Sequence, residues 1–238
     1  MIPLKDDIPS RTFPFITIML IIINSLIFLF EISLSQGELM ELFEYFGVIP
    51  ARFLALISVQ KFLDPSQFYT LFTSMFLHGG WFHIIGNMWY LWIFGDNVED
   101  RMGHFRYLIF YILCGIGAGL THIYLNPTST VPTIGASGAI SGVMGAYFIL
   151  YPRARVLTLV PVFIFVEILV IPAFFYLGFW VFMQFIEGTL LFLVPSNAGG
   201  VAVWAHFGGF ILGAIFVFFF RKPKHRVPRT YVDQYFPW

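Results

Sequence analysis

Charged residues are scarce in this sequence, and their scarcity excludes most classes of soluble protein. Only 11% of the 238 residues are Asp, Glu, Lys or Arg, whereas 58% are hydrophobic and 31 are phenylalanine. A soluble domain carries about 25% charged residues, so a mean hydropathy of +0.82 indicates a chain that folds in lipid. Thirteen basic and thirteen acidic residues cancel, so overall charge gives no reason to expect a nucleic-acid partner.

Cysteine and metal-binding patterns are also nearly absent. Cys114 has no second cysteine with which to form an internal disulfide, and one cysteine is too few for a Cys-rich zinc or iron–sulfur site. The sequence has no His-Glu-x-x-His pattern for a zinc protease. Asp96 and Asp100 lie at the end of a hydrophobic stretch rather than inside it, which argues against an aspartic protease. We therefore expect no metal and no cofactor.

Long stretches without charge are what the sequence does contain. A helix needs about 20 apolar residues to cross a bilayer, and the intervals between charged residues are long enough for six such helices. A turn at residues 126–132 divides the longest interval in two. The sequence predicts an all-α membrane protein, a six-helix bundle in one domain over residues 1–222, followed by a short basic tail at 223–238. The expected spans are residues 12–33, 82–101, 105–123, 133–152, 170–190 and 200–220.

A long outer loop is expected between the first two spans. Its residues 38–46 alternate glutamates with Leu and Phe at helical spacing, which predicts a helix lying in the interface plane. Lys and Arg resist translocation, and with a cytoplasmic N-terminus only Arg52 and Lys61 fall on the outer side. We therefore expect a multi-pass protein with both termini cytoplasmic, in a bacterial plasma membrane.

Polar residues inside spans are functional candidates, because an unpaired polar group is costly in lipid. Ser137 opens the fourth expected span within Gly135-Ala136-Ser137-Gly138. A serine at a helix N-terminus places free backbone N–H groups beside whatever its oxygen attacks, as an oxyanion site requires. The alternative is that Ser137 merely caps the helix, a role that serine often takes.

His206, in the sixth expected span, is a candidate base for Ser137. Gly209 follows it by three residues and Gly213 follows Gly209 by four, along one face, and a similar stripe of small residues lines the fourth span. Such stripes let two backbones approach closely in lipid, so we expect these spans to touch and His206 to face Ser137. The alternative is a hydrogen-bonded packing histidine. The glycines expected to support this contact are Gly135, Gly138, Gly142, Gly209 and Gly213.

His83 and Asn87 lie four residues apart and share one face of the second expected span. Together with the Ser137 backbone N–H, they could donate to an oxygen that gains charge during acyl transfer. The alternative is an interhelical hydrogen-bonded pair without chemistry.

In this order, the motifs resemble those of the rhomboid family of intramembrane serine proteases. His83-x-x-x-Asn87 is similar to the family's HxxxN, Gly135-x-Ser137-Gly138 to its GxSG, and Ala205-His206 with Gly209 and Gly213 to its AHxxGxxxG. The similarity runs from about residue 67 to about residue 215.

That resemblance, to the bacterial type with a six-span core, implies roles for these residues. Ser137 would be the nucleophile and His206 the general base, while His83, Asn87 and the Ser137 N–H would bind the oxyanion. No acid is well placed to orient His206, which indicates a Ser-His dyad. Ser141 stands where members commonly carry an aromatic under the catalytic histidine, so something else must steady His206.

The resemblance also implies partners. Substrates would be transmembrane helices of other proteins, cut in or near the bilayer, and the fifth span with Phe174, Phe175 and Trp180 would be the lateral gate. The lipid bilayer is the other expected partner, nucleic acid is not expected, and the oligomeric state is left open. Two alternatives remain: a catalytically silent rhomboid-like protein that binds transmembrane helices, and a haem protein with His83 and His206 as ligands.

Overall fold

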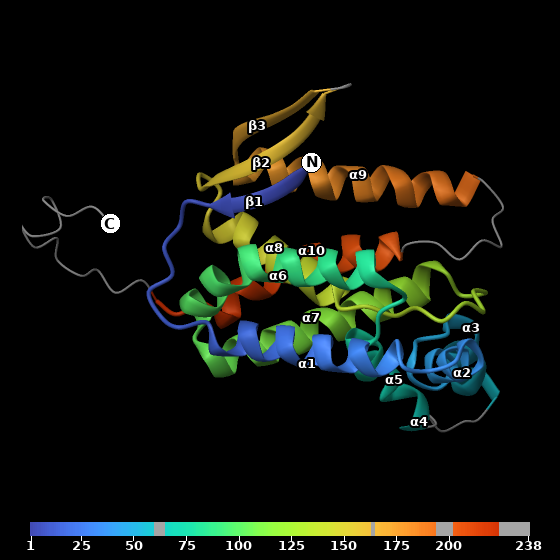
Figure 1. Cartoon of the computed structure of the whole chain (residues 1–238). Coiled ribbons are helices and arrows are strands. Elements are labelled where there is room, and N and C mark those ends of the chain that lie inside the picture. Colours follow the sequence, from blue (N-terminus) through green and yellow to red (C-terminus); the bar gives the residue numbers. More distant parts are fainter. Residues whose placement is uncertain (60–64, 163–164, 194–201, 224–238) are drawn as a thin grey trace, which may run out of the picture.

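Helices make up most of the computed structural model (Figure 1), which describes residues 1–59, 65–162, 165–193 and 202–223. Figure 1 shows the longer helices lying side by side, with the short helices α2 to α5 gathered at one end of this bundle. The helices are α1 (Phe15–Glu31), α2 (Gln36–Phe46), α3 (Pro50–Val59), α4 (Pro65–Phe68), α5 (Thr70–Thr73), the 3-10 helix η1 (Ser74–Phe76), α6 (Trp81–Met102), α7 (His104–Leu125), α8 (Ser137–Leu150), α9 (Ala173–Leu193) and α10 (Val203–Phe220).

A three-stranded antiparallel sheet corrects the prediction of an all-α fold. Its order is β1 (Ile2–Asp6), β2 (Arg155–Val162) and β3 (Phe165–Pro172), and β2 pairs with β3 along their full length. The predicted fifth span therefore starts too early, because residues 170–172 belong to β3 and α9 begins at Ala173. Asp6 at the end of β1 accepts hydrogen bonds from Asn97 and Tyr147, which ties the sheet to α6 and α8.

The predicted spans coincide with helices, and their ends differ by a few residues. Among the described residues, three helices are long and apolar enough to cross a membrane: α7, α9 over residues 173–190, and α10. The apolar helices α1 and α8 are shorter, and α6 carries Asp96, Glu99, Asp100 and Arg101 in its last turns. The chain is thus a mostly helical protein with several membrane-spanning candidates, and the count of six remains a prediction.

The start of α8 is the main difference in helix ends. Residues 133–136 were predicted as helix, but Gly135 adopts a positive φ of 125°, a conformation that glycine tolerates and other residues rarely adopt. The chain turns there and the helix begins at Ser137. In the outer loop, the helix predicted around 38–46 is present as α2, with a capping box between Ser35 and Glu38. The tail from residue 224 onward lies outside the described residues.

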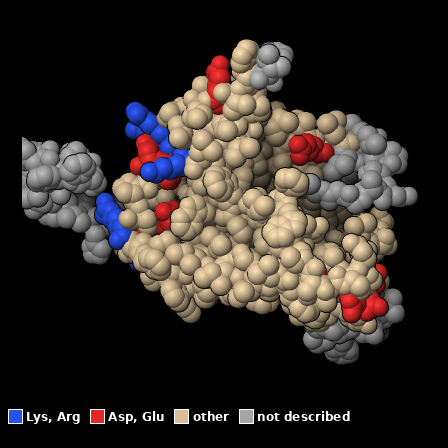
Figure 2. Space-filling model, viewed as in Figure 1, with Lys and Arg blue, Asp and Glu red and all other residues tan. Residues whose placement is uncertain are grey.

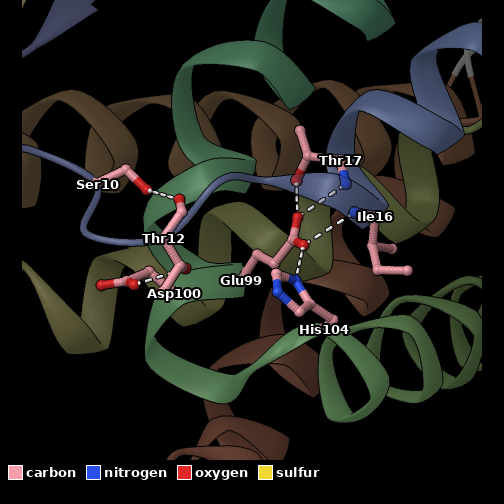
Figure 3. A network of polar contacts seen from close by, with 7 residues as sticks. All are labelled: Ser10, Thr12, Ile16, Thr17, Glu99, Asp100 and His104. Carbon is pink, nitrogen blue, oxygen red and sulfur yellow. Dashed lines mark hydrogen bonds and ion pairs between the residues drawn. The ribbon is translucent and has the colours of Figure 1, made fainter.

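A buried carboxylate holds the beginning of α1 against the end of α6 (Figure 3). Glu99, with no exposed surface, accepts hydrogen bonds from the backbone N–H groups of Ile16 (2.9 Å) and Thr17 (2.8 Å). The Thr17 hydroxyl (2.7 Å) and His104 Nδ1 (2.5 Å) complete its shell. The first four N–H groups of a helix have no partner within the helix, and Glu99 satisfies two of them at the start of α1.

Helix α8 forms the centre of the bundle. Every residue from Gly138 to Tyr147 is buried, with α6, α7 and α10 packed around it. Ser137 stands at the open end of this central helix, which is where the candidate site lies.

Candidate active site

The loop before α8 holds Ser137 in place from two sides. The Gly135 N–H donates to the Ser74 carbonyl at 2.8 Å, and Thr133 pairs with Val48 through two backbone hydrogen bonds. His122 of α7 contacts the Thr133 hydroxyl at 3.0 Å. Ser137 itself is only half-buried, so a fixed serine at a helix N-terminus keeps an accessible hydroxyl.

Helices α8 and α10 touch backbone to backbone along the glycine stripes. A Cβ built on Gly209 would lie 2.1 Å from the Gly138 carbonyl oxygen, and one on Gly213 would lie 1.9 Å from the Gly142 oxygen. Near the serine, a Cβ on Gly138 would lie 3.8 Å from the Ala205 oxygen. Since Gly138 follows Ser137 and Ala205 precedes His206, this contact brings the two candidate residues to the same end of adjacent helices.

The Nε2 atom of His83 lies close to Gly135 and the Ser137 hydroxyl. A Cβ on Gly135 would be 2.6 Å from His83 Nε2 and 3.6 Å from the Ser137 hydroxyl oxygen, so these two atoms are at most about 6 Å apart. The Gly79 N–H lies 3.4 Å from His83 Nδ1 and donates to it. With Nδ1 accepting, a neutral ring carries its proton on Nε2. His83 therefore presents a donor to the space beside Ser137.

Asn87, one turn further along α6, supplies a second candidate donor. Its side chain is 7% exposed, and its Nδ2 has no hydrogen-bond partner among the described residues. A buried amide donor without a partner costs about 1–3 kcal/mol. A buried donor without a partner needs an explanation. One explanation is that its partner is an oxygen of a ligand that is bound only during function.

His206 carries the opposite arrangement of protons. Its Nδ1 lies 2.6 Å from Gln184 Oε1 on α9, an oxygen that can only accept, so Nδ1 donates and Nε2 of the neutral ring remains an acceptor. The Trp180 ring lies 6.0 Å from the His206 ring, tilted by 33°. Within the described residues no hydrogen bond joins His206 to the Ser137 hydroxyl; such bonds are often long before substrate binds.

The site thus combines a serine hydroxyl at a helix N-terminus, a ring nitrogen able to accept a proton, and donors on α6. This combination can activate a hydroxyl and stabilise an oxyanion. No three His, Cys, Asp or Glu side chains group to hold a metal ion in the part of the chain that the structure describes.

Two contacts were not anticipated from the sequence. Gln184 was overlooked although it is a polar residue inside a predicted span, the criterion that selected Asn87. Trp180 was assigned only to the gate, whereas it also lies against His206. His78, by contrast, is buried beside His83, with ring centroids 5.1 Å apart, and its backbone N–H donates to the Glu31 carboxylate of α1.

The fold and the site define a helical membrane protein with a serine, histidine and amide cluster at the end of its central helix. A model of the Rhomboid domain matches residues 65–223, more than half of the chain. The chain belongs to the rhomboid family.

Relatives come from several compartments. Rhomboid-like protein 11, chloroplastic, of Arabidopsis thaliana is 38% identical over 74 residues, covering 31% of this chain and 26% of that protein. Rhomboid protein 1, mitochondrial, of Saccharomyces cerevisiae is 29% identical over 160 residues (63% and 41%). Rhomboid protease GluP of Bacillus subtilis is 34% identical over 84 residues (35% and 16%). The chain therefore spans less than half the length of each of these relatives.

Proposed function

We propose that this chain is an intramembrane serine endopeptidase that hydrolyses peptide bonds in or near transmembrane helices of other proteins. The observation that carries the proposal is the pair of contacts at the two imidazoles: the Gly79 N–H donates to His83 Nδ1, and His206 Nδ1 faces the Gln184 oxygen. From these contacts we infer opposite tautomers, in which His83 presents a donor and His206 an acceptor. A relative named as a rhomboid protease supports the same chemistry at the family level.

In the proposed reaction, His206 Nε2 takes the proton from the Ser137 hydroxyl as its oxygen attacks the substrate carbonyl. The Ser137 backbone N–H, His83 Nε2 and Asn87 Nδ2 donate to the oxyanion that forms. His206 then gives its proton to the leaving amine, and water releases the acyl group through the same steps. The neutral amide of Gln184 holds the ring, so the site is a Ser-His dyad without a carboxylate bonded directly to the histidine.

The orientation in the bilayer is part of the proposal. Lys and Arg side chains visible in Figure 2 gather at the end where β1, the start of α1 and the end of α10 lie, and positive residues favour the cytoplasmic side. We infer that both termini are cytoplasmic, that Ser137 lies toward the outer face, and that residues 1–222 form one domain. The relatives are chloroplastic, mitochondrial and bacterial, so the bacterial plasma membrane stays a prediction.

The decisive test is cleavage of a model transmembrane substrate by purified protein in detergent. Ser137→Ala should remove activity, whereas Ser129→Ala, in the loop before α8, should retain it. A Ser137→Ala protein that cleaves as fast as the parent would refute the proposal.

A fluorophosphonate probe separates this function from the alternative of a catalytically silent protein that binds transmembrane helices. Labelling of Ser137 that is lost in His206→Ala indicates an activated nucleophile. A folded parent protein that never labels favours the silent binder.

A further inference from the structure

His206 is held by one face of α9. Trp180 and Gln184 are four residues apart and so lie on the same side of this helix, and both contact the His206 ring, one through its indole and the other through its amide. One turn further on, Gly188 approaches α10 as well: a Cβ there would lie 2.8 Å from the Trp204 ring. The face of α9 that meets α10 therefore includes an aromatic, an amide and a glycine one turn apart, and Phe185 beside them packs against Trp204 and Phe207.

The hydrogen bonds around Gln184 fix which end of its amide faces the histidine. Gln184 Nε2 donates to Glu187 Oε2 at 3.2 Å, while Oε1 receives the His206 Nδ1 proton at 2.6 Å. Rotating the amide by half a turn would set its oxygen against the Glu187 carboxylate. The ring of His206 would then have to offer a lone pair from Nδ1, and its proton would move to Nε2, the nitrogen needed as the base.

We propose that Gln184 is a positioning residue for the reaction, which sets the His206 tautomer by accepting the Nδ1 proton while Glu187 fixes the amide and Trp180 limits the tilt of the ring. This inference rests on the proposed serine endopeptidase function. It assigns to α9 the part that an aspartate plays in soluble serine proteases, where the orienting residue holds the base in the productive tautomer.

A neutral amide has a different effect from a carboxylate. It orients the ring without adding a full negative charge that would favour the imidazolium. The base then relies on tautomer and geometry alone, and general-base catalysis contributes about 10²–10⁴ in rate. Loss of the acceptor should therefore lower turnover by about tenfold or more and leave substrate binding, measured as KM, largely unchanged.

The experiment compares Gln184→Met, which removes the acceptor at similar volume, with a double variant carrying Gln184→Glu and Glu187→Gln, which keeps an acceptor for His206 and sets an amide donor in place of the Glu187 carboxylate. Thr189→Val is the matched control, because Thr189 lies exposed on α9 and, within the described part of the chain, its hydroxyl donates to the Phe185 carbonyl of the same helix. We expect kcat to fall in Gln184→Met, to recover in the double variant carrying Gln184→Glu and Glu187→Gln, and to remain unchanged in Thr189→Val.

A second measurement reads the tautomer itself. In full-length protein carrying ¹⁵N-labelled histidine, with the His206 signals assigned from a His206→Ala sample, Nδ1 should be of the protonated type and Nε2 of the unprotonated type. In Gln184→Met this preference should weaken. A protonated Nε2 in the parent, or unchanged nitrogen signals and kcat in a folded Gln184→Met protein, would overturn the inference.

The two proposals fail separately. In one outcome the parent protein is labelled by fluorophosphonate, but Gln184→Met has the same rate and the same nitrogen signals as the parent. The endopeptidase proposal then stands and the proposed role of Gln184 is refuted. If the parent protein is never labelled, the endopeptidase proposal is refuted, and the hydrogen bond between Gln184 and His206 has no catalytic role. The nitrogen signals would still show whether that hydrogen bond is present.

Discussion

His206 belongs to the closely packed α8–α10 pair, and helix α9 contacts its ring. The two regions pack in different ways. Between α8 and α10 the backbones meet directly at glycines, and residues 138–147 of α8 are all buried. Helix α9 instead turns Phe174, Phe175, Phe179 and Phe182 outward, each about half exposed, a surface that suits lipid. The proposed nucleophile and base thus stand on a rigid pair, while Gln184, which we propose orients the base, stands on a helix with a largely open surface.

The largest expected effect on stability and activity comes from forcing α8 and α10 apart. Gly213→Val should prevent native packing, because its Cβ would lie 1.9 Å from the Gly142 oxygen and 2.5 Å from the Gly142 carbonyl carbon. Overpacking of this kind costs about 1–3 kcal/mol or more, and backbone atoms have little freedom to move aside. Thermal unfolding in detergent should show a lower Tm together with loss of cleavage.

The matched control for Gly213→Val is Gly86→Ala on α6, where a Cβ meets nothing within 4 Å. Alanine is favoured over glycine in a helix by about 1 kcal/mol, so this variant should be as stable as the parent or slightly more so. Equal Tm values for the two variants would show that the α8–α10 contact is no tighter than an open helix surface.

Asn87, on α6 beside the rigid α8–α10 pair, tests whether the site contains a group reserved for chemistry. Asn87→Ala should lower kcat by about 10²–10³, the loss expected for one oxyanion donor, with little change in Tm because its Nδ2 has no partner to lose. Asn24→Ala on α1 removes another buried amide, one that donates to the Leu20 carbonyl, and should leave kcat unchanged. A drop in Tm without a drop in kcat would assign Asn87 to packing.

Acid should lower the free energy of unfolding through His78, which lies in the loop before α6 and is 1% exposed. Burial, with a smaller contribution from His83, lowers the pKa of His78 from 6.5 to about 4. The unfolded chain then binds a proton first as pH falls, so stability is lost between about pH 6.5 and pH 4, by about 3 kcal/mol at most. His78→Leu should lose less Tm than the parent between pH 7.5 and pH 4.5; identical losses would exclude this source.

The smallest effect is expected on the open surface of α9. Phe182→Ala removes a ring that is 56% exposed and should change the free energy of unfolding in detergent by about 0.5 kcal/mol or less. Phe210→Ala on α10, where the ring is 3% exposed, should cost about 3 kcal/mol. Similar losses at both positions would remove the contrast between the two regions.

Charge spacing located the helices well because lipid penalises charge wherever the chain crosses it. The predicted 82–101 and 105–123 lie within α6 and α7, which end one or two residues further out. The same reasoning missed the sheet, because it treated the chain after Arg153 as a loop. A signal was available in the sequence: Val156, Thr158, Val160 and Val162 place a β-branched residue at every second position, the composition and period of a strand.

The candidate site was only partly accessible from sequence. Motif spacing nominated Ser137, His83, Asn87 and His206, because polarity inside a span is rare. The proton positions on the two imidazoles depend on Gly79 and Gln184, which lie on other segments and come into contact only when the helices pack. Polarity could have nominated Gln184, but nothing in the sequence places α9 beside His206.

If the chain cuts transmembrane helices as proposed, the shortness of α8 has a consequence for the products. Its 14 residues rise about 21 Å, whereas the hydrocarbon layer is about 30 Å thick. If its C-terminal end is level with the inner boundary, Ser137 lies about 9 Å beneath the outer one, the length of about six helical residues. A substrate severed at that depth would leave a stub on its outer part too short to stay anchored in the bilayer, so that part would be released while the remainder stays behind.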